Sequence, residues 1–481
     1  MKYLLIETVF DSPHLETSAE IALDLKNQRK SVNFSWIGYD LPWSDWSISK
    51  NKIILGASQI KKVNLIENIL KNNNIECETP IKINKKKLLK IKFWAKKFNG
   101  NLEKLKKYKY KNINLGIGVA SSLISYYHQS NLDTKKYYEV IVRALISSAI
   151  IYERSLLLIN KIKPKIVVTF NNRFASSLPI VLAAKSKKIR ILRHERGSNY
   201  NKYEIFKKDV HDLSYRSKNI KDYWLKEKNL KIKTKIAKKY FLNRRNGIPL
   251  GWDMKKNFTL KQKSGEIIPK DKNFTRIVFF TASEDEHEST KFQLKNLIWS
   301  TQELALKNLI KSLKILKKFE LFIRVHPTHG KRKSYVDQDK WIKFNNNKNI
   351  NVIPADSPVN SYELLDTADL IVTYGGNIGI EAVFWKKKVM TLRNSIYSGH
   401  GIAYEPKNFK NLKNIIKNFK KYKVINPNRA LPFAYYFMTF GKEFKFFKCK
   451  DFDECYYKNI PMSHLNSLLY VVKKIKKKLS R

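Results

Sequence analysis

The chain has 481 residues, of which 95 are Lys or Arg and 41 are Asp or Glu, so its formal net charge is +54. With 43% hydrophobic and 12% aromatic residues but only 16 Gly and 14 Pro, the composition excludes a disordered polybasic chain and a collagen-like or linker-rich protein. The length is typical of roughly two to four domains, each large enough to bury a core.

The positive charge has three explanations that composition alone leaves open. A basic surface neutralises phosphates, so a nucleic-acid-binding protein is one of them. Most of the basic residues are lysine, however, whereas arginine is the preferred bidentate reader of phosphate and guanine. Lysine accompanies Asn, Ile, Tyr and Phe along the whole chain, which favours a compositional background on solvated helix faces and makes nucleic acid the less favoured partner. An anionic membrane surface is the third explanation.

The chain has three cysteines, Cys77, Cys449 and Cys455. They form no CxxC pair and leave an odd count, which argues against a disulfide framework and against a cysteine zinc site. The N-terminus turns acidic at Glu7 with no small-residue cleavage site, so no signal peptide is expected. Glu153 and Arg154 interrupt the most apolar stretch, so no transmembrane helix is expected either. A reducing cytoplasm is the compartment we expect.

Short apolar runs alternate with helical patterns in the first half of the chain. Strands are predicted at 2–10, 31–37, 52–55, 165–170 and 189–193, and helices at 14–27, 60–71, 119–129, 134–160 and 174–186. The lysine-dense segment 85–111 is predicted to be a partly helical insertion that faces a membrane or forms a lid, with a solvated surface helix as the alternative. The alternation predicts a parallel sheet with crossover helices.

A second alternating series follows a polar, weakly periodic segment. Its strands are predicted at 276–281, 321–325, 351–353, 370–373 and 388–392, and its helices at 291–317, 334–344, 362–366 and 378–385. The fold predicted is therefore an α/β protein with two Rossmann-like domains that face a cleft. The boundaries predicted are an N-terminal domain over 1–205, a linker segment at 206–270, a C-terminal domain over 271–460 and a basic C-terminal helix at 461–481.

The turn after strand 370–373 is the most informative candidate site. Open α/β sheets bind ligands outside the carboxyl ends of their strands. Here Thr373 leads into Gly375, Gly376 and Asn377 and then into a helix that carries Glu381. Glycine lets the backbone approach a ligand, and amides at a helix start attract anions. Glu381 is placed to bond a ribose or sugar hydroxyl, and an ordinary strand-to-helix turn is the alternative.

Two other strand ends in the second half carry polar residues. Arg324 and His326 share a face of their strand, because alternate residues do, and Pro327 ends the ladder. Both side chains can donate hydrogen bonds to a phosphate that leaves. Strand 276–281 continues into Ser283 and the acidic run 284–286, which contacts a sugar or offsets nearby lysines.

Two turns in the first half are also rich in hydrogen-bonding groups. They contain Asn171, Asn172 and Arg173 after one strand, and His194, Glu195 and Arg196 after the next. Neighbouring strands end at one edge of a sheet, so we expect these turns to converge. The arginines on either side keep Glu195 ionised. It is a candidate base for an acceptor hydroxyl, or a member of a structural ion-pair cluster.

Asp11, His14 and Glu16 crowd the first strand-to-helix turn. One of the two carboxylates could remove the proton of an acceptor. The alternative is capping by Asp11 and a favourable interaction of Glu16 with the helix dipole. The chain has no GxxxxGK[ST], HExxH or GxSxG motif, and the segment 116–118 lacks the third glycine of a dinucleotide fingerprint. A P-loop kinase, a nicotinamide enzyme, a zinc protease and an α/β-hydrolase are therefore disfavoured.

Four of these motifs together resemble bacterial capsule and surface-polysaccharide biosynthesis proteins, which are GT-B-type glycosyltransferases of the Kdo-transferase-like capsule synthesis family. They are the segments 170–175, 194–197 and 324–327 and the turn 373–382 that leads to Tyr397. The resemblance implies a cytoplasmic, metal-independent enzyme without a cofactor. Its substrates would be a CMP- or NDP-linked sugar and a growing polysaccharide or lipid-linked acceptor. Lysines at 85–111 and 473–478 add an anionic membrane surface as an expected partner, which suits a peripheral position on the inner face of the cytoplasmic membrane.

The resemblance also implies roles for individual residues. His326 would contact the donor phosphate, and the turn at 375–377 would lie against the donor with Glu381 nearby. We expect Arg324 to assist at the phosphate, and one of Glu195, Asp11 or Glu16 to act as base while domain closure excludes water. The chain departs from the family in having Asn171-Asn172 where Asn-Gly is expected, and in its insertion at 85–111.

Several alternatives stay open at this point. A sugar-nucleotide 2-epimerase or a polyol-phosphate transferase would share the fold, and a nucleic-acid-binding protein or a non-catalytic scaffold for polysaccharide export would not be a transferase. Two DxD spacings, at 337–339 and 451–453, follow no apolar strand and are predicted to be surface acids rather than metal ligands.

Overall fold

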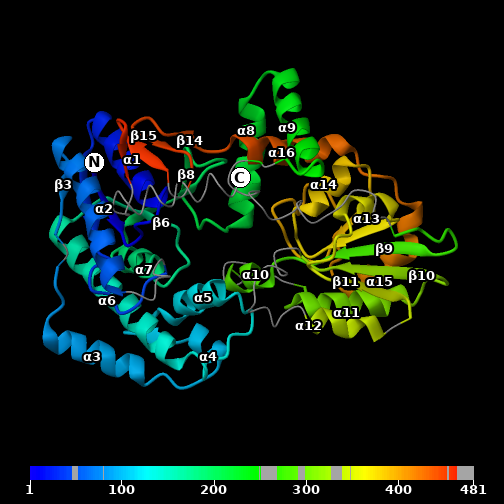
Figure 1. Cartoon of the computed structure of the whole chain (residues 1–481), viewed down its shortest axis with the longest axis horizontal. Coiled ribbons are helices and arrows are strands. Elements are labelled where there is room, and N and C mark those ends of the chain that lie inside the picture. Colours follow the sequence, from blue (N-terminus) through cyan, green and yellow to red (C-terminus); the bar gives the residue numbers. More distant parts are fainter. Residues whose placement is uncertain are drawn as a thin grey trace. The chain divides into compact units, whose positions relative to one another are not determined.

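A computed structural model describes residues 1–45, 52–79, 81–248, 250, 268–290, 298–326, 339–346, 348–451 and 454–462. Pro327 and nearly all of the predicted C-terminal helix at 461–481 lie outside these ranges. The chain divides into two compact units (Figure 1). Unit 1 contains Met1–Tyr126, Asn131–Val210 and the segment from Phe440, and unit 2 contains Tyr127–Ser130 and His211–Thr439. Residues 440–460 thus join the N-terminal unit, whereas the sequence placed them in the C-terminal domain.

Unit 1 is built on a seven-stranded sheet in the order β14-β8-β7-β6-β1-β2-β3. The strands are β1 (Lys2–Glu7), β2 (Ser31–Trp36), β3 (Glu76–Cys77), β6 (Ile166–Phe170), β7 (Arg190–Arg196), β8 (Lys202–Phe206) and β14 (Lys442–Glu443). The five from β7 to β3 pair in parallel, and β8 pairs antiparallel with β7. The chain runs outward from β1 to β3 and then returns to β6, so β1 and β6 flank the switch point where such sheets bind ligands.

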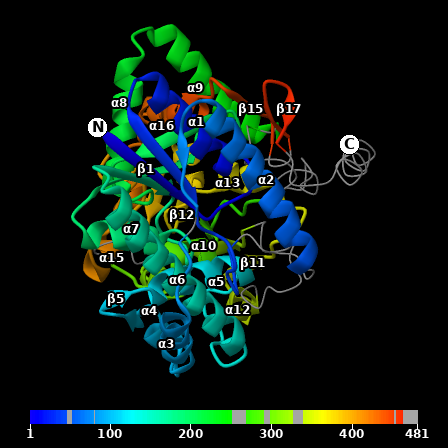
Figure 2. The ribbon, with the colours of Figure 1, turned by 90° about the vertical axis from the view of Figure 1, so that its left-hand side faces the viewer.

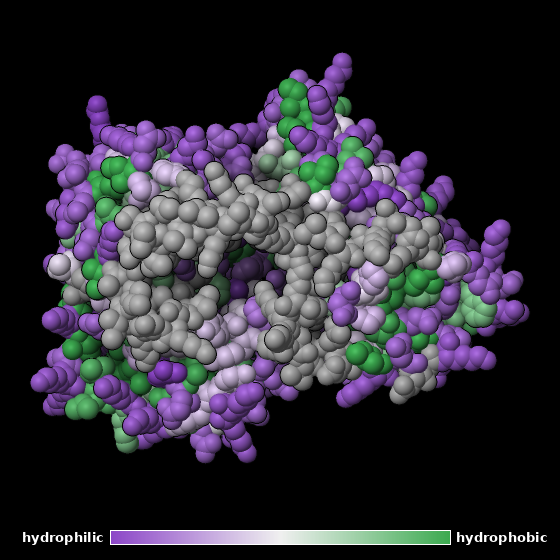
Figure 3. Space-filling view, in the orientation of Figure 1, coloured by the Kyte–Doolittle hydropathy of each residue, from purple (hydrophilic) through white to green (hydrophobic). Residues whose placement is uncertain are grey.

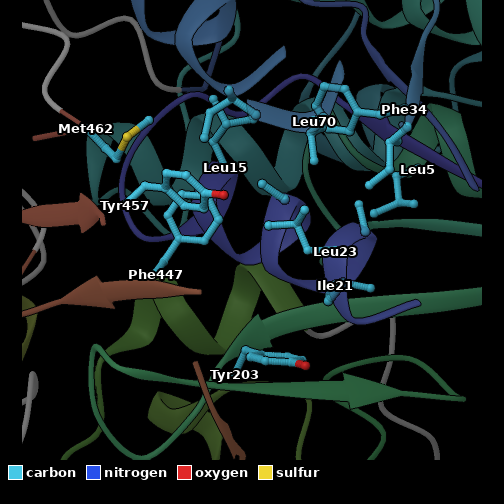
Figure 4. Close-up of a cluster of buried hydrophobic side chains, with 14 of the residues drawn as sticks. Leu5, Leu15, Ile21, Leu23, Phe34, Leu70, Tyr203, Phe447, Tyr457 and Met462 are labelled. Atoms are coloured by element: carbon cyan, nitrogen blue, oxygen red, sulfur yellow. The ribbon is translucent and has the colours of Figure 1, made fainter. Parts of the chain in front are cut away.

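Two pairs of helices cover this sheet. They are α1 (His14–Asn27) with α2 (Lys52–Asn72), and α6 (Tyr138–Ile162) with α7 (Leu178–Ser186). Leu5 and Phe34 of the sheet pack with Leu15 of α1 in one buried core, and Phe447 and Tyr457 of the C-terminal segment join it (Figure 4). This contact explains why the C-terminal segment belongs to unit 1.

The C-terminal segment of unit 1 is a small antiparallel sheet. Its strands are β15 (Phe447–Cys449), β16 (Cys455–Tyr457) and β17 (Ile460–Pro461). Cys449 and Cys455 are cross-strand partners and form a disulfide, whereas Cys77 is free. The sequence argued against a disulfide framework but did not reveal this single pair, because spacing in sequence does not show which residues a hairpin places opposite each other.

The lysine-rich insertion is confirmed as a partly helical element. It consists of α3 (Lys85–Lys96), α4 (Leu102–Lys106), β4 (Lys109–Tyr110) and β5 (Ile113–Asn114), followed by α5 (Gly116–Tyr127). Helix α3 lies next to α6 (Figure 2). It buries Ile91 and Ala95, while its lysines stay largely exposed. Trp94 stacks on Tyr108 at a centroid distance of 5.1 Å and ties the helix to the following hairpin.

Two predictions in unit 1 were wrong. The strand expected at 52–55 is the start of α2, a helix of 21 residues, since a short apolar run does not by itself distinguish strand from helix. The strand expected to end at Arg193 continues to Arg196, because β8 extends the ladder and pairs Glu195 with Glu204. His194, Glu195 and Arg196 therefore lie in a strand and not in a turn.

Unit 2 is built on a five-stranded parallel sheet in the order β11-β10-β9-β12-β13. Its strands are β9 (Thr275–Phe280), β10 (Phe319–Arg324), β11 (Ile350–Ile353), β12 (Leu370–Thr373) and β13 (Val389–Thr391). All five were predicted from the sequence and are confirmed. This order reverses between β9 and β12, which makes their carboxyl ends the second switch point of the chain.

One set of helices surrounds this sheet, and three further helices form a separate group. Those around the sheet are α10 (Glu284–Thr290), α11 (Gln302–Leu313), α12 (Asp339–Ile342), α13 (Ser361–Thr367), α14 (Ile378–Phe384) and α15 (Phe409–Asn418), with single 3₁₀ turns at Lys343–Asn346, Phe419–Lys421 and Pro427–Ala430. The separate group contains α8 (Leu213–Lys226), α9 (Leu230–Arg245) and α16 (Leu431–Thr439). Helix α16 contacts both α8 and α9, so these two helices of the linker expected at 206–270 are packed parts of unit 2.

The predicted α/β class with two Rossmann-like units is confirmed, since unit 1 has a largely parallel sheet and unit 2 a parallel one. Hydrophilic side chains make up most of the coloured surface in Figure 3, in keeping with the high content of lysine. Within the described ranges, no helix combines the length and apolarity needed to span a bilayer.

Candidate functional site

A buried acid–imidazole pair lies beneath the switch point of unit 1. Glu7, the last residue of β1, has Oε1 at 2.7 Å from Nε2 of His194 on β7. The Ser18 hydroxyl donates to the same oxygen (3.1 Å), and the Phe170 amide donates to Oε2 (3.4 Å). The Glu7 and His194 side chains are 1% and 0% exposed. His194, expected at a cleft, therefore fastens β7 to β1 across β6.

Glu195 points to the opposite side of the strand and is partly open to solvent. Its side chain is 23% exposed, and Nδ1 of His14 lies 3.9 Å from Oε1. Nδ2 of Asn171 donates to Oε2 (2.7 Å), and the Arg196 amide donates to Oε1 (3.0 Å). Asn171 adopts φ of 50°, a left-handed conformation that Asn tolerates better than most residues. The structure thus brings together three of the predicted residues, from β7, the β6 end and the start of α1.

The His14 imidazole is neutral at pH 7. Burial lowers its pKa well below the ordinary value, and the positive charges of Arg196 and Lys62 and the nearby His194 lower it further. Its ring packs on Phe170 at a centroid distance of 4.3 Å. A neutral imidazole next to a carboxylate can orient a hydroxyl group by donating or accepting a hydrogen bond.

Glu16 and Asp11, the other two candidate bases, are placed differently. Glu16 is fully buried, with Lys62 Nζ at 2.9 Å and the Ser12 hydroxyl at 2.7 Å from its carboxylate. It has no exposed oxygen to offer an acceptor. The main-chain carbonyl of Asp11 accepts from the amide of His14 (2.9 Å) and closes the start of α1.

The rest of the β6 turn is fastened to neighbouring elements. The Asn172 carbonyl oxygen Oδ1 accepts from the Val210 amide (3.1 Å), and Arg173 donates to the Ser121 and Ser125 hydroxyls of α5 (3.0 and 2.9 Å). These contacts are structural and show how the turn is held without the expected Asn-Gly.

Asp45 is an acid beside the β6 turn that no sequence motif indicated. Its Oδ2 accepts from the Ser176 amide (3.0 Å), and burial raises its pKa. It lies in an irregular segment with no motif, so only the fold reveals its place beside the β6 turn.

The glycine turn of unit 2 is built tightly at the end of β12. The Thr373 hydroxyl accepts from the Gly376 amide (2.9 Å), and the Tyr397 hydroxyl donates to the Gly376 carbonyl (3.1 Å). Gly375 has φ of 80°, which favours glycine. A Cβ atom on Gly379 would lie 2.6 Å from the Tyr397 hydroxyl oxygen, so that position also requires glycine. Asn377 follows as the N-cap of α14, without a side-chain capping bond.

The Arg324 side chain forms its hydrogen bonds with the segment that follows β11. Its side chain is 1% exposed, and it donates to the carbonyls of Pro354 and Ser357 (3.2 Å to the latter) and to the Ser361 hydroxyl (3.4 Å). Burial lowers its pKa to about 10. These contacts do not support the phosphate contact expected of Arg324.

Glu381 is likewise used inside the protein. It is 1% exposed, accepts from the Tyr362 hydroxyl, and has Arg244 Nε at 2.8 Å from Oε1. Burial and the Glu381 charge raise the pKa of Tyr362. Glu381 therefore anchors α14 to α9 and α13, and no sugar contact is assigned to it.

His326 and Ser283 follow β10 and β9 at the switch-point edge. The His326 amide donates to the Thr281 hydroxyl (2.9 Å), which links the ends of the two strands. Ser283 is buried, and its carbonyl accepts from the His287 amide (3.1 Å) at the start of α10. In the acidic run, Asp285 Oδ2 lies 2.7 Å from His128 Nδ1, so this acid has a specific partner.

Arg393, which follows β13, is a second residue that the sequence did not single out. Its side chain is 7% exposed, and its Cζ atom lies 5.5 Å from the ring centroid of Tyr374. One arginine after a short strand matches no motif, and its burial appears only in the folded chain.

The comparisons with known proteins agree with the predicted resemblance. Residues 299–434 match the family described as capsule polysaccharide biosynthesis protein, a range that runs from α11 to α16 in unit 2. The resemblance to these proteins is thereby confirmed over that range. No sequence among the curated proteins matches the chain.

Several solved structures match the chain at low sequence identity. The β-Kdo 2,4-transferase KpsC of Thermosulfurimonas dismutans is 13% identical, over 56% of this chain and 79% of that chain, with a TM-score of 0.37. The UDP-GlcNAc 2-epimerase of Neisseria meningitidis, solved with UDP-GlcNAc, is 12% identical over 90% and 97%, with a TM-score of 0.25. The spinosyn rhamnosyltransferase SpnG is 9% identical over 90% and 93%, also with a TM-score of 0.25.

Proposed function

We propose that the chain is a metal-independent glycosyltransferase of capsule or surface-polysaccharide synthesis. Its donor would be a CMP- or NDP-linked sugar and its acceptor a growing polysaccharide or glycolipid. The observation that carries this proposal is the pair of chemically different switch-point sites. Unit 1 offers a partly exposed carboxylate, and unit 2, where the capsule-synthesis match lies, offers a glycine turn beside basic side chains.

The donor is assigned to unit 2. His326 follows β10, next to β9 at the switch point, where its imidazole can donate a hydrogen bond to a phosphate. Gly375 and Gly376, which follow β12, have no side chains, so a ligand can approach the backbone there. A phosphate held in this way leaves with its negative charge stabilised, and this lowers the barrier to breaking the bond between the sugar and the phosphate.

The acceptor is assigned to unit 1, with Glu195 as the base. A base needs an exposed acceptor oxygen, and Glu195 has one while Glu16 does not. Asn171 holds the carboxylate in one orientation. In the step proposed, Glu195 takes the proton of the acceptor hydroxyl, the hydroxyl oxygen bonds to the anomeric carbon, and the nucleotide leaves with the electron pair of the broken bond.

Nucleotide binding is the direct test of the donor assignment. In a thermal-shift screen against CMP, UDP, GDP and CDP, one nucleotide is expected to stabilise the protein by about 2.7 kcal/mol at a concentration 100-fold above its Kd. His326→Ala should weaken this effect, and His326→Gln, which keeps a donor, should retain part of it. A protein that no nucleotide stabilises, or a His326→Ala variant that is stabilised like the wild type, would contradict the assignment.

We also propose that α3 holds the enzyme at an anionic membrane surface. Leu89 and Phe93 are 66% and 64% exposed and lie one turn apart on a lysine-rich helix. Such a helix places apolar side chains among lipid headgroups while its lysines contact the anionic charge.

Vesicle binding tests this second assignment. The wild type is expected to sediment with phosphatidylglycerol vesicles and much less with phosphatidylcholine vesicles, and Leu89→Ser with Phe93→Ser should release it. The matched control is Leu230→Ser with Leu242→Ser on α9, which removes exposed apolar side chains from another lysine-rich helix. Equal loss of binding in both double variants would contradict a specific role of α3.

A further inference from the structure

The Arg393 side chain carries a buried charge that the protein itself does not neutralise. It is 7% exposed, and its Nε atom is fully buried without a hydrogen-bond partner. Across the part of the chain that the structure describes, its guanidinium forms no hydrogen bond or salt bridge. Arg276 of the same unit shows the usual arrangement: it is fully buried, but it pairs with Glu320 (2.6 Å) and also donates to the Thr367 hydroxyl (3.0 Å).

Burial of the charge has a different energetic effect on Arg393 than on Arg276. Burial alone lowers the pKa of Arg393 to about 10, and no carboxylate offsets the loss of solvation. A buried charge without a partner destabilises a folded protein, and a ligand that supplies the opposite charge would offset this cost. Among the described residues, the guanidinium has one favourable electrostatic contact, which is its packing on the Tyr374 ring.

The surroundings of Arg393 are those of the glycine turn. A Cβ atom on Gly375 would lie 3.8 Å from the Cβ of Arg393 and 3.6 Å from the carbonyl oxygen of Asn394, so the ends of β12 and β13 are in direct contact. His287 of α10 lies on Tyr374 as well, at a centroid distance of 5.7 Å, and its Nδ1 is buried without a partner among the described residues. Two basic side chains from different elements of unit 2 thus contact the same tyrosine, which follows β12 at the switch point.

We propose that Arg393, with His287 packed on the same tyrosine, adds a phosphate-binding subsite to unit 2 at the end of β13, besides the phosphate contact assigned to His326. The ligand class is a nucleotide phosphate, with the donor phosphate as the natural occupant, so the assignment of the ligand rests on the proposed function. A guanidinium presents paired N–H donors that match two phosphate oxygens, which a lysine does not. Arg393, which follows the strand next to β12, would thus make the phosphate contact that was expected of Arg324.

The experiment compares Arg393→Met, Arg393→Lys and the control Arg276→Met in the full chain. The apo Arg393→Met protein should melt at the same temperature as the wild type or higher, because it loses an unpaired charge, whereas Arg276→Met should melt lower. Titration with CMP and UDP should show roughly 10- to 150-fold weaker binding of the preferred nucleotide to Arg393→Met, the range for a hydrogen bond to a charged group. The nucleotide affinity of Arg393→Lys should lie between those of the wild type and Arg393→Met. The nucleosides cytidine and uridine should bind the wild type and Arg393→Met equally.

Other outcomes of this experiment would overturn the subsite or contradict the proposed function. An Arg393→Met protein that melts lower and binds nucleotides as tightly as the wild type would show that Arg393 only packs on Tyr374, and would overturn the subsite even if sugar transfer persists. Inorganic phosphate bound through Arg393, without any sugar transfer, would support the subsite and contradict the proposed function. Failure of both phosphate and nucleotides to bind the wild type would overturn the subsite.

Discussion

Glu195→Gln is expected to lower the rate of sugar transfer by about 10²- to 10⁴-fold, the contribution typical of a positioned general base. Glutamine keeps the size and the hydrogen-bonding oxygen that contacts Asn171 but cannot take a proton. Nucleotide affinity should stay unchanged, since the carboxylate belongs to unit 1 and the donor is assigned to unit 2. Steady-state kinetics with saturating donor would show the loss in kcat.

The matched control for this experiment is Glu204→Gln. Glu204 is the cross-strand partner of Glu195 on β8, so the substitution removes the same charge from the same sheet position on the neighbouring strand. It should leave kcat within a few-fold of the wild type. A Glu195→Gln enzyme that turns over as fast as Glu204→Gln would exclude Glu195 as the base and direct attention to His14.

Lys62→Met is expected to lower the free energy of unfolding of unit 1 by about 3–5 kcal/mol. Lys62 and Glu16 are both fully buried, with Nζ at 2.9 Å from Oε1, so methionine would leave the carboxylate buried without its counter-charge. Urea unfolding would measure the change. The double variant Lys62→Met with Glu16→Leu should recover most of the lost stability, because it removes both charges.

Lys71→Met provides the control on the same helix. Lys71 is 54% exposed and lies 3.8 Å from Glu67, and such exposed pairs contribute only about 0–1 kcal/mol. A Lys62→Met protein no less stable than Lys71→Met would contradict the assignment of Glu16 to a structural ion pair and would return it to the candidate bases.

The strands and helices around the sheets were largely predictable because their signals are local. The helix His14–Asn27 and the strand Leu370–Thr373 agree with prediction at both ends, since a 3.6-residue period and a compact apolar run are read within the segment itself. The error at 52–55 has the same origin: a run of four apolar residues does not show whether the chain continues as a helix. The role of the segment after Phe440 depends on a contact with α1 that is distant in sequence.

The candidate site was predictable in place but not in the roles of its charged residues. The sequence directed attention to the right strand ends, because ligand-binding turns of α/β sheets carry glycine and polar residues. Whether a charged side chain at such an end is free or committed depends on distant partners. Glu381 is held by Arg244 and Tyr362, and Arg324 is held by the loop after β11, while Arg393 has neither kind of partner among the described residues.

Product analysis tests the central claim most directly. The full chain is incubated with each candidate nucleotide-sugar, labelled in the sugar, and with a capsule oligosaccharide acceptor. The label is expected to appear in a longer oligosaccharide through a new glycosidic bond, with one free nucleotide released for each sugar transferred. Conversion of the donor into an epimeric nucleotide-sugar, or an acceptor that stays unlabelled with every donor, would contradict the assignment as a glycosyltransferase.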